Sequence, residues 1–100
     1  MTILAGIIKV HLPYAHSLKE KRKTLKSLMA KIAQRHSASV REIDSHDAHQ
    51  IITLGFSLTT LSETEARDVT YAIEQTIWKT IESEGNLLQF SVECLPFLGT

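Results

Sequence analysis

Two helix-start motifs of the same kind constrain this chain more than any other feature. Each has the form S-x-x-E, with Ser17 and Glu20 in the first and Ser62 and Glu65 in the second. The serine hydroxyl and the glutamate carboxylate satisfy backbone N–H groups that a helix start leaves without partners. The sequence therefore predicts two helices, the first beginning at Leu18 and the second just after Ser62.

The segments around these helices alternate between apolar and polar residues, as strands do. Residues 3–12 alternate imperfectly, and residues 52–58 alternate cleanly between an apolar face and a small polar face. Residues 40–43 alternate weakly, which is typical of an edge strand. The last predicted strand has an apolar face formed by Leu88, Phe90, Val92 and Cys94.

The predicted order is strand, helix, strand, strand, helix, strand. Two right-handed crossovers in one sheet place both helices on the same side and leave the other side open. This order predicts an α+β fold of the ferredoxin-like type, βαββαβ, a two-layer sandwich with an antiparallel four-stranded sheet and two helices on one face. Residues 1–100 suit a single domain of this kind. The open face is expected to hold Ile7, Lys9, His11, Thr53, Gly55, Ser57, Gln89, Ser91 and Glu93.

The net charge is zero, but the charges are unevenly distributed along the chain. Residues 17–36 hold seven basic residues against one acid, Glu20, whereas residues 62–84 hold six acids against Arg67 and Lys79. Cations gathered near one helix start can contact the phosphates of RNA, and a solvated helix face is the alternative. The candidate phosphate-binding residues are Lys19, Lys21, Arg22, Lys23 and Lys26.

A second candidate surface lies on the acidic helix. Tyr71 and Trp78 are seven residues apart, and therefore nearly superposed on the helix, about 120° from its inward face. Large aromatic residues are enriched at interfaces. They predict a docking site or a homodimer contact, although they could instead cover the flank of the first helix.

Other reactive side chains give weaker signals. Asp44, His46, Asp47 and His49 combine carboxylate and imidazole groups in one turn, but their spacing matches no zinc pattern, so no metal site is assigned and the question stays open. Cys94 has no base beside it in the sequence and is expected to be a buried, inert thiol that reacts slowly.

The sequence also bears on catalysis and location. No glycine-rich phosphate loop is present, and no catalytic residue or cofactor is predicted. His36 falls near a helix C-terminus, where a cation is favoured. No apolar run approaches the roughly 20 residues of a membrane-spanning helix. With no secretory signal and a single cysteine, we expect a cytoplasmic protein without a membrane partner.

Three segments resemble the YlxP-like family of small, uncharacterised bacterial proteins. They are K-V-H-L-P at residues 9–13, S-L-K-E-K-R at residues 17–22, and Asp47-Ala48 ahead of L-G-F at residues 54–56. The resemblance covers nearly the whole chain and implies the same ferredoxin-like fold, but no reaction, substrate or catalytic residue. The chain departs from the family pattern at His49, where relatives commonly show Trp.

Family members often look associated with genes for translation and ribosome maturation, which implies RNA or the ribosome as a partner. Together with the basic first helix, this resemblance leads us to expect a non-catalytic RNA- or ribosome-associated protein, without DNA specificity. The alternative is a protein-interaction module or homodimer that uses Tyr71 and Trp78.

Overall fold

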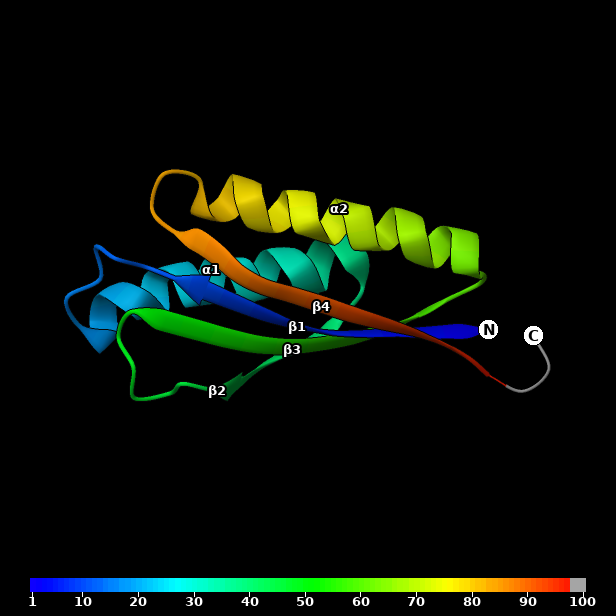
Figure 1. The fold of residues 1–100 in the computed structure, drawn as a ribbon, viewed down its shortest axis with the longest axis horizontal. Helices are drawn as coiled ribbons and strands as arrows, with labels where there is room; N and C mark the ends of the chain where they lie inside the picture. Colours follow the sequence, from blue (N-terminus) through cyan, green and yellow to red (C-terminus); the bar gives the residue numbers. More distant parts are fainter. Residues whose placement is uncertain (98–100) are drawn as a thin grey trace.

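A computed structural model describes residues 1–97 and has the predicted order of elements (Figure 1). The antiparallel sheet is formed by β1 (Thr2–His11), β2 (Ser39–Asp44), β3 (Ile51–Thr60) and β4 (Asn86–Pro96). The helices α1 (Leu18–His36) and α2 (Glu63–Ile81) lie side by side on one face of this sheet. The strand order β2-β3-β1-β4 is that of the ferredoxin-like fold, as predicted.

The core lies between the helices and the sheet. The central strands β1 and β3 pair along their whole length, and alternate side chains point toward the helices, with Ile8 opposite Leu54. Helix α1 packs on β2 and β3, whereas α2 packs mainly on β4 and β1. The buried apolar side chains include Leu4, Ile8, Val10, Leu25, Leu28, Ile32, Ile52, Leu54, Phe56, Ile73, Ile77 and Ile81.

Gly6 makes room for an aromatic ring at the centre of the sheet. A Cβ atom at this position would lie 2.6 Å from the Phe56 ring and 2.8 Å from the carbonyl oxygen of Ser91. The Phe56 ring also stacks with Phe90, at 6.3 Å between ring centroids. Glycine is therefore required on β1 because the ring occupies the space that a side chain would fill.

The last strand departs from the prediction in two places. A bulge between Lys9 and Val10 shifts the register, so that Leu87 pairs with Val10 and Leu88 is exposed instead of buried. The prediction that Cys94 is buried is also wrong, because its side chain is exposed. Strand β4 is an edge strand. A hollow of about 360 Å³ separates the C-terminal half of β4, which contains Cys94, from the first turns of α2.

Candidate nucleic-acid interface

Helix α1 begins with the predicted capping box. The Oγ atom of Ser17 accepts a hydrogen bond from the backbone N–H of Glu20, at 3.2 Å. The Glu20 carboxylate accepts a hydrogen bond from the backbone N–H of His16, at 2.9 Å. The one acid among the α1 cations therefore helps to fix the helix start, where a negative charge also favours the helix dipole.

Four of the five candidate cations form one exposed surface. Lys19, Arg22, Lys23 and Lys26 are all exposed, and at 100° per residue they fall within an arc of about 100° on the outer side of α1. They span about 10 Å along the helix axis. Within residues 1–97, none of the four forms an ion pair with a carboxylate. We call these four residues the α1 cation surface.

Lys21 does not belong to this surface, which corrects the prediction from the sequence. Its side chain is 1% exposed and points inward. The Nζ atom donates hydrogen bonds to the carbonyl oxygens of Ser45, at 2.7 Å, and Ala48, at 2.9 Å. The same atom lies 2.9 Å from Glu42 Oε2 in an ion pair. All three ammonium protons can thus be used inside the protein, so Lys21 fastens α1 to the loop at residues 45–50 and is not available to a ligand.

The sequence contained a signal for this burial. Lys21 falls four residues before Leu25, seven before Leu28 and eleven before Ile32, and all three of these leucine and isoleucine side chains are buried. This spacing places Lys21 on the inward stripe of the helix. At the N-terminal end of this stripe the helix faces the loop between β2 and β3, whose backbone carbonyl oxygens accept hydrogen bonds from the ammonium group. These hydrogen bonds allow the charged group to be buried.

Glu42 connects the buried lysine to the loop between β2 and β3. Its Oε1 atom lies 2.8 Å from Nδ1 of His46. Burial by itself raises the pKa of Glu42, but the hydrogen bonds and positive charges of Lys21 and His46 outweigh it and hold the pKa below its ordinary value. Glu42 is therefore ionised at neutral pH and pairs with Lys21.

The acidic and imidazole side chains of the same loop do not converge. The Oδ1 atom of Asp44 accepts a hydrogen bond from the backbone N–H of Ser45, at 2.7 Å, while His46 contacts Glu42. Across residues 1–97, no three His, Cys, Asp or Glu side chains form a group able to hold a metal ion. Asp47 and His49 are both exposed.

His36 is more enclosed than its place at the helix end suggested. Its Nε2 atom lies 3.0 Å from Oγ1 of Thr76 on α2. Burial, and secondarily the positive charge of Arg35, lower the pKa of His36. Both effects oppose the positive charge that a helix C-terminus favours.

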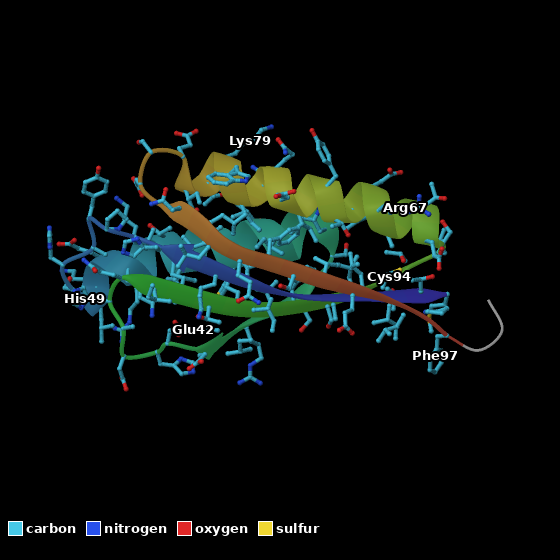
Figure 2. All side chains as sticks on the ribbon, in the orientation of Figure 1. Glu42, His49, Arg67, Lys79, Cys94 and Phe97 are labelled. Atoms are coloured by element: carbon cyan, nitrogen blue, oxygen red, sulfur yellow. The ribbon has the colours of Figure 1, made fainter. Side chains whose placement is uncertain are left out.

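The aromatic pair on α2 is exposed, as its helical position predicted. The side chain of Tyr71 is 66% exposed and that of Trp78 is 43% exposed. Lys79 projects from the same helix into solvent (Figure 2). Tyr71 therefore lies mainly in solvent, while more than half of the surface of Trp78 is covered by the protein.

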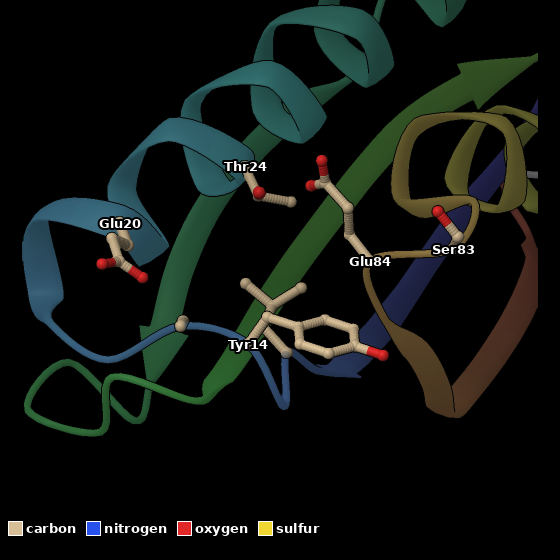
Figure 3. Close-up of a pocket in the computed structure, with 7 residues that line it drawn as sticks. Tyr14, Glu20, Thr24, Ser83 and Glu84 are labelled. Atoms are coloured by element: carbon tan, nitrogen blue, oxygen red, sulfur yellow. The ribbon is translucent and has the colours of Figure 1, made fainter.

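The pocket in Figure 3 lies next to the start of α1, where the loop after β1 meets the loop after α2. Its volume is about 420 Å³, and Tyr14, Glu20, Thr24, Ser83 and Glu84 line it together with Leu12 and Ala15. A smaller hollow places Lys23 and Glu84 on opposite sides of the groove between the helices. Carboxylates therefore border the α1 cation surface on this side and limit its extent.

The described part of the chain contains no helix that is both apolar enough and long enough to span a lipid bilayer. Both helices have 19 residues, but each has charged residues along its outer face.

Solved structures resemble this fold at low sequence identity. A de novo designed protein with a ferredoxin fold matches with a TM-score of 0.56 and 13% identity, over 100% of this chain and 89% of that chain. A dinuclear metal binding peptidase of the M20 family from Bacillus subtilis, YXEP, matches with a TM-score of 0.61 and 9% identity, over 97% of this chain and 26% of that chain. The present chain spans about a quarter of that peptidase. These likenesses show the fold alone.

The family to which this chain belongs, in contrast, is identified from its sequence. No curated protein matches the chain. A family model described as "Protein of unknown function (DUF503)" matches residues 3–90, which include the α1 cation surface, Lys21 and its partners in the loop after β2. Because this match covers most of the sequence, the chain belongs to the DUF503 family of proteins of unknown function.

Proposed function

We propose that this protein binds the phosphate backbone of RNA through the α1 cation surface, as a non-catalytic, ribosome-associated protein of the bacterial cytoplasm. In this proposal it is a YlxP-like member of its family, which the S-L-K-E-K-R run at residues 17–22 supports. The observation that carries the proposal is a set of four exposed cations on one face of α1 without carboxylate partners in residues 1–97.

The position of these cations on the helix favours a role in binding. The N-terminal end of a helix bears a partial positive charge, so a cation in the first turn costs about 0.3–1 kcal/mol at low salt. Lys19 lies in the first turn, where helix stability alone would favour an acid, and Arg22 and Lys23 follow in the second turn. An anionic ligand removes this cost, and the Arg22 guanidinium can contact two phosphate oxygens at once.

The proposal specifies the RNA backbone and not its bases. Proteins that read single-stranded RNA on an open sheet stack the bases on aromatic side chains. Both aromatic residues of the strands, Phe56 and Phe90, point toward the helices in this sheet. Binding is therefore expected to depend on charge and on the shape of the RNA, with little preference for base sequence.

Co-sedimentation with ribosomal particles across a salt series tests this proposal. If all four cations contact phosphates, the affinity should fall about 50- to 150-fold between 50 and 200 mM salt. The variant with both Lys23→Glu and Lys26→Glu should bind more weakly, and its affinity should fall only about 10-fold over the same range. Lys79→Glu, the same charge change on α2, should bind as the wild type does.

Two results would contradict the proposal. One is no association even at low salt. The other is an association that the Lys23→Glu and Lys26→Glu changes leave intact while circular dichroism shows both proteins folded.

The exposure of Tyr71 and Trp78 favours a second candidate function, a protein-interaction module that uses the outer face of α2. Trp78→Ala should then abolish capture of the partner without lowering the thermal midpoint by more than a few degrees, because the ring is partly in solvent. A partner that binds the variant and the wild type equally would exclude this candidate.

A further inference from the structure

The face of the sheet opposite the helices is open, yet exposed apolar side chains extend across it. Ile7 on β1 is 39% exposed, Ile43 on β2 is 49% exposed, and Leu95 on β4 is 51% exposed. The strand registers place Ile7 and Leu95 on this open face, and Ile43 lies over Gly55, which belongs to it as well. Ile7 and Ile43 flank Gly55 from β1 and β2, so two of these apolar side chains lie close together at the middle of the face.

The middle of the open face is hollowed. A depression of about 430 Å³ has the small residues Ala5, Gly55 and Ser91 in its lining, with Ile7 and Glu93 beside them. A second depression of about 260 Å³ shares Gly55 and continues toward Arg41 and Ile43 on β2. The face thus combines projecting isoleucine side chains with a hollow next to them, which is a shape that can fit a copy of itself.

We propose that the open face binds the same face of a second copy of this chain, around a two-fold axis parallel to the strands. Arg41, Gly55, Ile7 and Ser91 are aligned in one row across β2, β3, β1 and β4. The two-fold axis places β1 over β3 of the partner and β2 over β4 of the partner. Ile7 then faces Gly55 of the partner subunit, and the same contact is formed twice.

One pair of opposite charges on the two edges of the face is brought together in this arrangement. Arg41 lies on the β2 edge, and Glu93 lies on the β4 edge, two residues along from Ser91 in the same strand. With β2 over β4 of the partner, Arg41 lies about 7 Å along the strand from Glu93 of the partner subunit, within reach of its long side chain. Each dimer contains this pair twice, and the pairing fixes which edges meet.

The area of the face suits a dimer of moderate affinity. With strands about 4.8 Å apart and about 3.3 Å per residue, the ten residues of β1 and of β3 and the six of β2, which limit the overlap with β4 of the partner, give a face of about 500 Å². Two such faces bury about 1,000 Å², the lower limit for a specific interface. We therefore expect a dimer that dissociates in the micromolar range.

Sedimentation equilibrium over a concentration series tests this proposal, with the 11.2 kDa of one chain as the monomer reference. Ile7→Glu should raise the dimer dissociation constant at least about tenfold, because it places a carboxylate in an apolar contact twice. Arg41→Glu and Glu93→Arg should each weaken the dimer, and the two changes combined should restore it to within about threefold of wild type. Trp78→Ala is the control and should leave the dissociation constant unchanged.

Two outcomes would overturn this proposal. The first is a protein that remains at 11.2 kDa up to millimolar concentration. The second is a dimer that Trp78→Ala disrupts while Ile7→Glu and the charge exchange do not. Failure of the dimer proposal can be told apart from failure of the RNA proposal, because α1 lies on the other face of the sheet. The Ile7→Glu variant should still bind ribosomal particles in a salt-dependent way.

Discussion

Replacing Lys21 with methionine should destabilise the fold far more than the same change at a neighbouring lysine. Methionine keeps the length and the apolar stem of lysine but removes the ammonium group. In the wild type this group lies within 2.9 Å of two carbonyl oxygens and of the Glu42 carboxylate. Lys21→Met leaves the carbonyl oxygens of Ser45 and Ala48 without this donor and leaves Glu42 without its principal counter-charge.

The expected loss follows from these contacts. Removing one partner of a buried ion pair costs about 3–5 kcal/mol. The Glu42 side chain is 18% exposed and keeps its contact with His46, which places the loss at the lower end, about 3 kcal/mol. For a domain of this size, that loss lowers the thermal midpoint by about 12–24 °C. Lys19→Met, at an exposed position two residues away, should change the stability by less than about 0.5 kcal/mol.

Urea unfolding followed by circular dichroism measures both variants. A third variant combining Lys21→Met with Glu42→Leu should be more stable than the sum of the single changes predicts, because it removes both charges of the pair. A cost of less than about 1 kcal/mol for Lys21→Met would show that the ammonium group does not fasten α1 to the loop between β2 and β3.

Two further predictions concern Glu42 and Cys94. The pKa of Glu42 is lower in the native state than in the unfolded chain. The ionised carboxylate therefore contributes its full stability at pH values above the ordinary carboxylate pKa. This contribution disappears as the pH falls through the lowered native pKa. Glu42→Gln should therefore flatten the acid side of the stability profile measured by urea unfolding between pH 7 and pH 3, and an unchanged profile would contradict this. Cys94 is exposed at the edge of the sheet (Figure 2) and should react with a thiol reagent at nearly the same rate in the native and the unfolded protein; strong protection in the native state would contradict its exposure.

The fold could be predicted because local signals and global topology agree in this sequence. Both S-x-x-E motifs form the expected bonds from the Glu20 and Glu65 backbone N–H groups to Ser17 and Ser62. The strands alternate with a period of two, and the crossover rule leaves one side of the sheet for both helices. Each step used only residues close together in the sequence, and the structure bears out the whole order of elements.

Two differences from the prediction, at Leu88 and Cys94, depend on distant segments. The bulge that exposes Leu88 is set by pairing with β1, and nothing near Leu88 in the sequence marks it. Cys94 lies on the inward side of β4, but the first turns of α2 do not close over it. Lys21, in contrast, has the spacing of an inward residue, and its helical position, not its positive charge, indicates where it lies. A lysine in an apolar stripe indicates a buried partner elsewhere in the chain.

NMR titration of the ¹⁵N-labelled protein with an RNA hairpin tests the central claim most directly, because it locates the contact surface residue by residue. The account predicts that the largest amide shifts fall on Lys19, Arg22, Lys23 and Lys26, that they diminish as salt is raised, and that Lys79 on α2 is unaffected. Shifts centred on Tyr71 and Trp78 or on the open face of the sheet, or no shifts at low salt, would contradict it.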